Sequence, residues 1–118
     1  MLQAVHTSQF IDGNWMSTAT ELKTKLDTGE QLLLLDVREA WEYELCSIEG
    51  SINIEMQQID KIENEIKPEN ETIVICHHGM RSFQVASYLE SKGFTKITNL
   101  EGGVDAWART VDTAMEQY

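Results

Sequence analysis

The chain has 118 residues, enough for one domain with a buried core. With 42% hydrophobic and 25% charged residues, its composition is typical of a folded globular protein and argues against disorder. The net charge of −11 disfavours nucleic acids and anionic membranes as partners, since binding to either requires clustered Lys and Arg. We expect a single domain over residues 1–118, with 1–15 as an N-terminal arm or edge strand and 109–118 as a C-terminal tail.

Cysteine usage and hydropathy indicate a cytoplasmic location. The only two cysteines, Cys46 and Cys76, are too few for a disulfide scaffold and suit a reducing compartment. No apolar run approaches the roughly 20 residues that span a membrane. The first residues also lack the basic and apolar regions of a secretory signal. We therefore expect a cytoplasmic protein with no membrane partner.

The predicted elements alternate between helix and strand. Residues 18–21 have the spacing of a helix capping box, and apolar residues at helical spacing continue to a stop at Gly29. Two continuous apolar runs, 32–35 and 73–75, suit parallel strands buried on both faces. The remaining predicted elements are helices at 41–44, 59–66 and 82–89, strands at 52–54 and 96–98, and a helix containing 104–107. This alternation predicts an α/β fold with a mostly parallel central sheet flanked by helices on both faces.

Residues 76–82, Cys-His-His-Gly-Met-Arg-Ser, lie between an apolar run and the next predicted helix. The first N–H groups of a helix have no partners inside it, and the helix dipole places partial positive charge there. This environment stabilises a cysteine thiolate, the nucleophilic form. Cysteines at strand ends are more often small buried apolar residues, but the neighbouring Gly, Arg and Ser favour an anion-binding loop. We therefore predict Cys76 as the catalytic residue.

The other residues of this loop are candidate contacts of an anionic substrate. Gly79 permits a backbone conformation that costs other residues energy, and Arg81 contributes a permanent positive charge. Ser82 suits an N-cap or first-turn position, from which its hydroxyl can donate towards the site.

His77, His78 and Met80 are the side chains expected to face the substrate. Either histidine can donate to an anion near pH 7, so affinity for an anionic donor should rise as the pH falls through the histidine range. Metal binding by Cys76 and the two histidines is disfavoured, because adjacent ligands rarely converge on one ion. We therefore expect no metal.

Four segments, in order, resemble the rhodanese homology domain in its single-domain bacterial form. They are residues 34–39, 48–54, 76–82 and 99–107, and the resemblance extends from about Thr18 to Trp107. It implies a sulfurtransferase whose Cys76 takes a sulfane sulfur from a donor such as thiosulfate and becomes a persulfide. Cyanide, a thiol or a protein cysteine then accepts the sulfur. No cofactor is implied. A sulfur-relay protein is a further candidate partner, and a monomer or weak dimer is expected.

Two alternatives remain. The first is a non-catalytic or carrier module that receives sulfur from a partner protein. The second is a small phosphatase or arsenate reductase, as in the related cell-cycle dual-specificity phosphatases, whose loop has one more residue. Because four residues separate Cys76 from Arg81, the spacing resembles that of the sulfurtransferases and disfavours the second alternative.

Asp36 and Arg38 follow the first apolar run and are interpreted as supporting residues of the site. Asp36 can accept hydrogen bonds from the loop or pair with Arg81, and Arg38 can pair with an acidic residue as a structural clamp. In the family that the chain resembles, such residues look mainly structural. Trp41 and Trp107 are interpreted as packing residues.

The sequence departs from the family pattern beside the second segment. Cys46-Ser47 stands where Gly-His is common, and Glu49 where proline is common. These changes leave the substrate preference open. Cys46 is either a resolving thiol for Cys76 or a small packed residue, and packing is favoured because nothing in the sequence brings the two sulfurs within bonding range.

Overall fold

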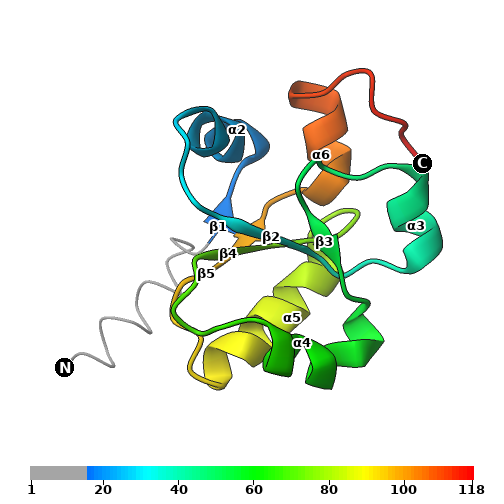
Figure 1. Ribbon diagram of the computed structural model, residues 1–118. Coiled ribbons are helices and arrows are strands. Elements are labelled where there is room, and N and C mark those ends of the chain that lie inside the picture. Colours follow the sequence, from blue (N-terminus) through cyan, green and yellow to red (C-terminus); the bar gives the residue numbers. More distant parts are fainter. Residues whose placement is uncertain (1–15) are drawn as a thin grey trace.

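A five-stranded parallel sheet separates two layers of helices in the computed structural model, which describes residues 16–118 (Figure 1). The strand order is β1-β5-β4-β2-β3. The strands are β1 (Met16–Ser17), β2 (Leu33–Asp36), β3 (Ile52–Asn53), β4 (Thr72–Ile75) and β5 (Ile97–Leu100). The helices are α2 (Ala19–Asp27), α3 (Ala40–Leu45), α4 (Ile59–Glu65), α5 (Met80–Ser91) and α6 (Gly103–Thr110), and a 3₁₀ turn, η1 (Met56–Gln58), precedes α4. The predicted α/β fold is confirmed; the arm or edge strand predicted for 1–15 lies outside the described residues.

Each face of the sheet has its own apolar core. α4 and α5 cover one face, where Ile62, Val85 and Leu89 pack with Leu35 and Val74 of the sheet. α2 and α6 cover the other face, whose buried residues include Ala19, Leu22, Leu34, Ile73, Val104 and Trp107. Successive side chains of a strand point to opposite faces, so β2 and β4 contribute to both cores. This explains why these strands are continuously apolar.

Helix α2 begins with the predicted capping box. The Thr18 hydroxyl accepts from the Glu21 backbone N–H at 3.1 Å, and the Glu21 carboxylate accepts from the Thr18 N–H at 2.9 Å. Helix α5 begins at Met80, two residues earlier than predicted, with Gly79 at its N-cap. Ser82 consequently lies in the first turn of α5 rather than at its cap.

The two tryptophans differ in exposure. Trp107 is 6% exposed and packs in the core, as expected. The expectation for Trp41 is wrong, since this side chain is 59% exposed. The physical reason is that α3 turns Glu42 inward, and successive residues of a helix point about 100° apart, so Trp41, the residue before Glu42, faces away from the core.

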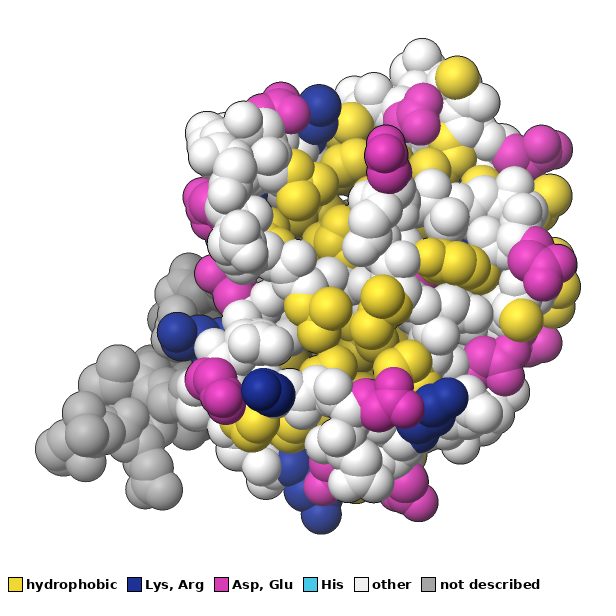
Figure 2. All heavy atoms as spheres, viewed as in Figure 1, with side chains coloured by type: hydrophobic (Ala, Val, Ile, Leu, Met, Phe, Trp, Pro, Cys, Tyr) yellow, Lys and Arg dark blue, Asp and Glu magenta, His cyan; other side chains and the backbone are white. Residues whose placement is uncertain are grey.

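The face of the molecule in Figure 2 carries acidic side chains spread around its periphery, in keeping with the net charge of −11. Apolar side chains show in patches between them. Within residues 16–118, no helix is both long enough and apolar enough to cross a membrane.

Three neighbouring strands, β5, β4 and β2, end at the same edge of the sheet because they run parallel. The loop that follows β4 therefore lies beside the start of α6, which follows β5. The backbone N–H of Val104 donates to the carbonyl of Cys76 at 2.9 Å, and that of Asp105 donates to the carbonyl of His77 at 3.0 Å. The N-terminus of α6 thus holds the loop through its main chain.

Gly103 marks the closest approach of α6 to this loop, and a Cβ there would overlap the carbonyl oxygens of Cys76 and His77. Its φ is 59°, a left-handed conformation. We expect Gly103→Ala to lower the free energy of unfolding by roughly 2–4 kcal/mol, since backbone strain and steric overlap add. Urea unfolding measures the loss.

Gly93→Ala is the matched control for this change. Gly93 has a φ of 98°, but an added Cβ would meet nothing within 4 Å. Its loss should be about 1 kcal/mol, the cost of the left-handed backbone alone. Equal losses for the two variants would contradict a steric role for Gly103.

Candidate active site

The sulfur of Cys76 accepts hydrogen bonds from three donors. Cys76 follows β4 and is only 1% exposed. Its Sγ lies 3.1 Å from the backbone nitrogen of Gly79 and 3.3 Å from both the backbone nitrogen and the hydroxyl of Ser82. These two N–H groups belong to the N-cap and first turn of α5, where they have no helical partner. Together with the helix dipole they stabilise negative charge on the sulfur, or on an atom bonded to it.

The loop owes its shape to Gly79 and to β5 beside it. Gly79 has a φ of +100°, and an added Cβ would lie 3.2 Å from the backbone nitrogen of Gly102. The Gly79 carbonyl accepts a hydrogen bond of 3.2 Å from Nδ2 of the buried Asn99 on β5. A larger residue at Gly79 would therefore strain the backbone and press on the start of α6.

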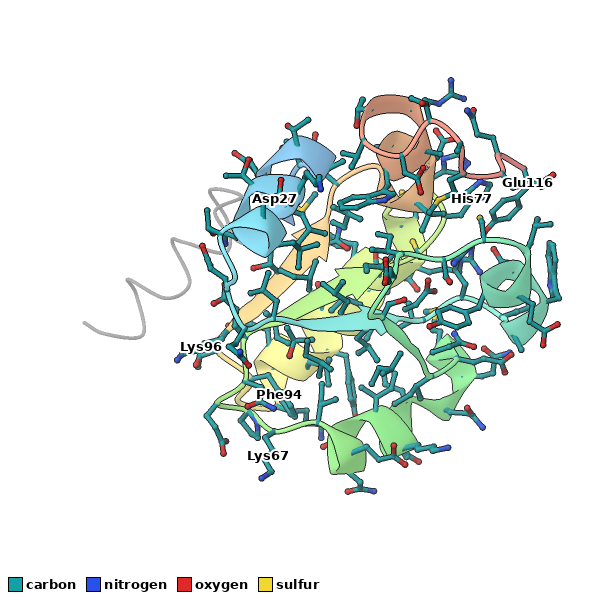
Figure 3. All side chains as sticks on the ribbon, turned by 45° about the horizontal axis from the view of Figure 1, so that its top comes forward. Asp27, Lys67, His77, Phe94, Lys96 and Glu116 are labelled. Atoms are coloured by element: carbon teal, nitrogen blue, oxygen red, sulfur yellow. The ribbon has the colours of Figure 1, made fainter. Side chains whose placement is uncertain are left out.

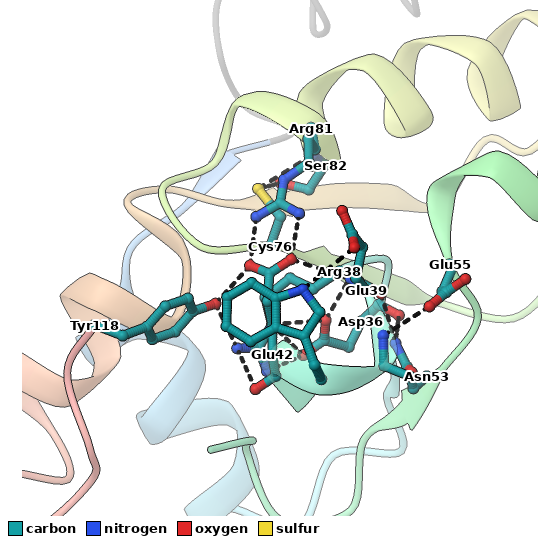
Figure 4. A network of polar contacts seen from close by, with 12 residues as sticks. Asp36, Arg38, Glu39, Glu42, Asn53, Glu55, Cys76, Arg81, Ser82 and Tyr118 are labelled. Carbon is teal, nitrogen blue, oxygen red and sulfur yellow. Dashed lines mark hydrogen bonds and ion pairs between the residues drawn. The ribbon is translucent and has the colours of Figure 1, made fainter. Parts of the chain in front are cut away.

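Arg81 forms a two-bond ion pair with Glu42 of α3. Its Nη1 and Nη2 lie 2.7 Å and 2.8 Å from the two carboxylate oxygens (Figure 4). The hydrogen bonds from Arg81 hold the pKa of Glu42 at about 2, against the opposing effect of burial and with help from the hydroxyl of Tyr118. The same bonds raise the pKa of Arg81 above its ordinary value. The ion pair joins α3 to α5 beside the sulfur.

Asp36 and Arg38 form a second, fully buried ion pair. The Arg38 Nη2 lies 2.7 Å from Asp36 Oδ2, and neither side chain is exposed. Arg38 also donates to the carbonyl of Cys46 at 2.6 Å and to the hydroxyl of Tyr118 at 2.8 Å. Burial alone would lower the pKa of Arg38, but hydrogen bonds to Asp36 and Tyr118 outweigh it and raise the pKa. Asp36 therefore pairs with Arg38, and the partner of Arg81 is Glu42.

The two loop histidines lie in different surroundings. The ring of His77 stacks on that of Tyr118, with centroids 3.8 Å apart and planes 4° from parallel. Burial, and then repulsion by His78, lower the pKa of His77 from its ordinary 6.5, so this ring is neutral at pH 7. His78 is exposed, and its Nδ1 lies 3.9 Å from Oδ2 of Asp105. Of the two loop histidines, His78 is therefore the one that lies open to solvent.

His77, His78 and Asp105 present ligand atoms within 4.8 Å of one another. The two imidazole planes, however, are inclined by only 31° at a centroid distance of 3.9 Å. Lone pairs in the two ring planes would meet an ion at an angle far below the ~109° of a tetrahedral site. The stacked rings must separate before they can share a metal ion.

The remaining predicted residues lie at the margin of the site. Met80 is 73% exposed at the start of α5. Cys46 is half-buried, with its Sγ 3.8 Å from Nη1 of Arg38. Its thiol therefore contacts the charged network around Arg38.

Sequence reasoning missed three residues of the site: Glu42, Asn99 and Tyr118. Glu42 precedes Arg81 by 39 positions and Tyr118 follows Glu42 by 76 positions, so no local spacing relates them. The only available signal was the position of Glu42 in the short helix after Asp36 and Arg38. Asn99 lies in a segment of the family resemblance but carried no chemical signal of its own.

The family model of the rhodanese-like domain matches residues 18–110 of this chain. The chain belongs to the rhodanese-like family. The match covers every described element from α2 to α6 and includes the cysteine loop, whereas Tyr118 lies outside it.

Two curated proteins that are similar to this chain are named as a sulfurtransferase and a sulfur carrier. The putative sulfurtransferase YtwF of Bacillus subtilis is 40% identical over 92 residues, which is 78% of this chain and 87% of that protein. The putative sulfur carrier protein YrkF of the same organism is 39% identical over 85 residues, 72% of this chain. The chain spans less than half of YrkF, 46% of its length.

Solved structures share the fold. A rhodanese-related protein from Thermoplasma volcanium is 29% identical with a TM-score of 0.74, over 81% of this chain and 92% of that one. A rhodanese-like domain protein from Staphylococcus aureus is 33% identical with a TM-score of 0.69, over 76% of this chain and 87% of that one.

The charge of Glu42 should make stability depend on pH. Its carboxylate stabilises the fold above its ordinary pKa of 4.5, and this contribution disappears as the pH falls towards 2. We expect Glu42→Gln to lower the free energy of unfolding at pH 7 by roughly 1.5–3 kcal/mol. The variant should then lose less stability between pH 4.5 and 2.5 than the wild type. Urea unfolding across this range measures both effects.

Glu65→Gln is the control for this experiment. Glu65 forms an exposed pair with Lys61 at 3.9 Å, so its replacement should change stability by less than about 0.5 kcal/mol. A pH dependence of Glu42→Gln that parallels the wild type would show that the Arg81 pair does not stabilise the fold.

Proposed function

We propose that the chain is a sulfurtransferase that carries sulfane sulfur as a persulfide on Cys76. The observation that carries this proposal is the set of three donors around the buried sulfur. A persulfide extends the side chain by one atom and keeps a negative charge on its terminal sulfur. The N–H groups at the start of α5 are placed to stabilise that charge. Membership of the rhodanese-like family and the name of YtwF support the same chemistry.

The reaction proceeds in two half-reactions. The thiolate of Cys76 attacks the outer sulfur of a donor such as thiosulfate, the donor S–S bond breaks, and sulfite leaves with the bonding electrons. Cyanide, a small thiolate or a protein thiolate then attacks the terminal sulfur of the persulfide. The persulfide S–S bond breaks, and Cys76 regains its thiolate. The two steps together require no outside oxidant or reductant.

The ion pair with Glu42 limits how strongly Arg81 can attract the sulfur donor. Two of its five N–H donors bind Glu42, so the charge of the guanidinium is largely compensated within the protein. The remaining N–H groups of Arg81 can bind an oxygen of the sulfur donor. The main attraction for an anion then comes from the backbone N–H groups of the loop, which act at short range despite the net charge of −11.

The loop geometry favours sulfur over phosphate. Four residues separate Cys76 from Arg81, one fewer than in the loop of the related phosphatases, so the loop encloses less space for a phosphoryl group.

Substitution of Cys76 tests the proposal directly. We expect the wild type to form thiocyanate from thiosulfate and cyanide. Cys76→Ser should form none, because the serine hydroxyl does not ionise at neutral pH and cannot replace the thiolate as nucleophile. Mass spectrometry after donor treatment should show one added sulfur atom on Cys76. Cys46→Ser serves as the control and should retain both properties. A sulfur adduct that survives in Cys76→Ser would place the chemistry elsewhere.

Ser82 tests the role of the donors. Ser82→Ala removes the hydroxyl that lies 3.3 Å from the sulfur and keeps the backbone N–H. We expect sulfur loading from thiosulfate to slow by roughly tenfold, below the loss usual for a full oxyanion-hole donor. Ser91→Ala, which removes an exposed hydroxyl bonded to the Tyr88 carbonyl, should leave the rate unchanged. Equal rates for all three proteins would remove the hydroxyl from the mechanism.

A carrier that exchanges sulfur only with partner proteins is the second candidate, and the name of YrkF favours it. Both candidates need the Cys76 persulfide. They differ in turnover: an enzyme releases thiocyanate repeatedly, while a carrier loads one sulfur per chain and discharges it slowly to cyanide. A single-turnover burst without a steady rate would favour the carrier.

A further inference from the structure

Residues 111–118, which follow α6, run back to the active site. This segment crosses towards α3, where the chain ends beside that helix (Figure 1). Val111, Met115 and Tyr118 pack against the core of the α2 and α6 face. Figure 3 shows His77 next to the part of this segment that carries Glu116. These three apolar contacts with the core hold the segment in place beside the cysteine loop.

The hydroxyl of Tyr118 connects the two ion pairs of the site. It accepts from Nη1 of Arg38 at 2.8 Å and donates to Oε1 of Glu42 at 2.8 Å (Figure 4). The same Glu42 oxygen accepts from Nη2 of Arg81 at 2.8 Å. A hydroxyl has one proton to donate, and here it binds a carboxylate, which makes the bond strong and directional. Tyr118 thereby fixes the carboxylate that holds Arg81.

The ring of Tyr118 covers the residue next to the reactive sulfur. It lies parallel to the imidazole of His77 at a centroid distance of 3.8 Å. The ring of Trp41 makes an edge-to-face contact with the same Tyr118 ring, with the two centroids 5.9 Å apart. Nε2 of His77 is buried and has no hydrogen-bond partner. Stacking, rather than hydrogen bonding at that nitrogen, therefore orients the imidazole.

We propose that Tyr118 is a positioning residue of the sulfur-transfer site, whose ring holds His77 beside Cys76 and whose hydroxyl holds Glu42 against Arg81. The proposal rests on the proposed function of Cys76. It assigns a role to a residue outside the segment 18–110 that matches the family. A residue that only packs against the core would affect stability but not the protonation of His77 or the binding of the donor.

The charges around His77 come from four elements. His78 of the loop and Arg81 of α5 oppose its protonation, while Asp105 of α6 and Glu42 of α3 favour it. Tyr118 adds no charge near neutral pH, because burial raises its pKa to about 12 with a further contribution from Glu42. The effect of Tyr118 on His77 is therefore cover from water, which keeps the imidazole neutral.

Two substitutions separate the ring from the hydroxyl. Y118F keeps the stacked ring and removes the bonds to Glu42 and Arg38. Y118L removes the ring together with the hydroxyl and keeps apolar contact with the core, so the difference between Y118L and Y118F reports the ring. The pKa of His77 is measured by NMR in the chain without substrate, with H77Q identifying the signal. The Michaelis constant for thiosulfate and kcat are measured by thiocyanate formation between pH 5.5 and 8.

Y118L should bring the pKa of His77 back towards its ordinary value of 6.5. Its Michaelis constant should then fall as the pH drops through that range, since protonated His77 attracts the dianionic donor. Y118F should keep the lowered pKa of His77 but raise the Michaelis constant at pH 8 by roughly three- to tenfold, because Glu42 is then held less firmly in the position in which it binds Arg81. In both variants kcat should change by less than about twofold.

Y88F is the matched control. The hydroxyl of Tyr88 also binds a carboxylate, Glu63, at 2.6 Å, but on the far part of α5. Y88F should leave the pKa of His77 and the Michaelis constant of the donor unchanged. Thermal unfolding of all variants separates stability from function. If Y118L does not fold, Y118M, with a flexible apolar side chain at the same place, replaces it.

Unchanged His77 titration in Y118L together with an unchanged Michaelis constant in Y118F would overturn the proposal and leave Tyr118 a packing residue. Failure of the proposed function is a different result: the wild type itself would then form neither persulfide nor thiocyanate. In that case the His77 titration of Y118L against Y118F decides by itself whether Tyr118 orients the loop.

Discussion

Three hydrogen-bond donors converge on the sulfur of Cys76, and the contacts around the loop hold them in this arrangement. Donors at the start of a helix point at one atom only if the turn that carries them is fixed. The N–H groups of α6 bind the carbonyls of Cys76 and His77, and Asn99 binds that of Gly79. Each of these contacts is to the main chain. The shape of the loop therefore depends on how β4, β5 and α6 pack, and only weakly on its own side chains.

Charged groups next to this loop form a connected and nearly balanced network. Asp36 pairs with Arg38, Glu42 pairs with Arg81, and the hydroxyl of Tyr118 joins the two pairs. Buried charges without partners are costly, so loss of one member leaves the others destabilised. Under the proposed function, this balance leaves the backbone N–H groups as the main attraction for an anionic donor, because the carboxylates neutralise the arginines.

The side chains of the cysteine loop differ in their exposure to solvent. His78 and Met80 are exposed, whereas His77 is covered by Tyr118 and is neutral at pH 7. If the chain acts as proposed, a small sulfur donor meets the exposed side chains of His78 and Met80 first. The segment that carries Tyr118 lies beyond the part of the chain that matches the family. Under the proposed function, the choice of donor by this chain is expected to depend on His78, Met80 and this segment rather than on the loop backbone.

The sequence by itself determined the order of the main helices and strands after residue 18, the parallel sheet and the cysteine loop, but not the two-residue strand β1 or the 3₁₀ turn η1. Continuous apolar runs before Asp36 and Cys76, capping signals and helical spacing are local features, and they survive in the structure because strand burial and helix initiation obey local rules. The loop was equally readable, since its residues are adjacent and resemble those of a known family.

Only the tertiary structure decided which partners these residues have. Arg81 binds Glu42 rather than Asp36, Trp41 is exposed, and Tyr118 stacks on His77. These contacts join residues that are separated by 39 to 80 positions along the chain, where sequence spacing carries no information. They follow instead from three parallel strands ending at one edge of the sheet, which brings distant segments within hydrogen-bonding distance.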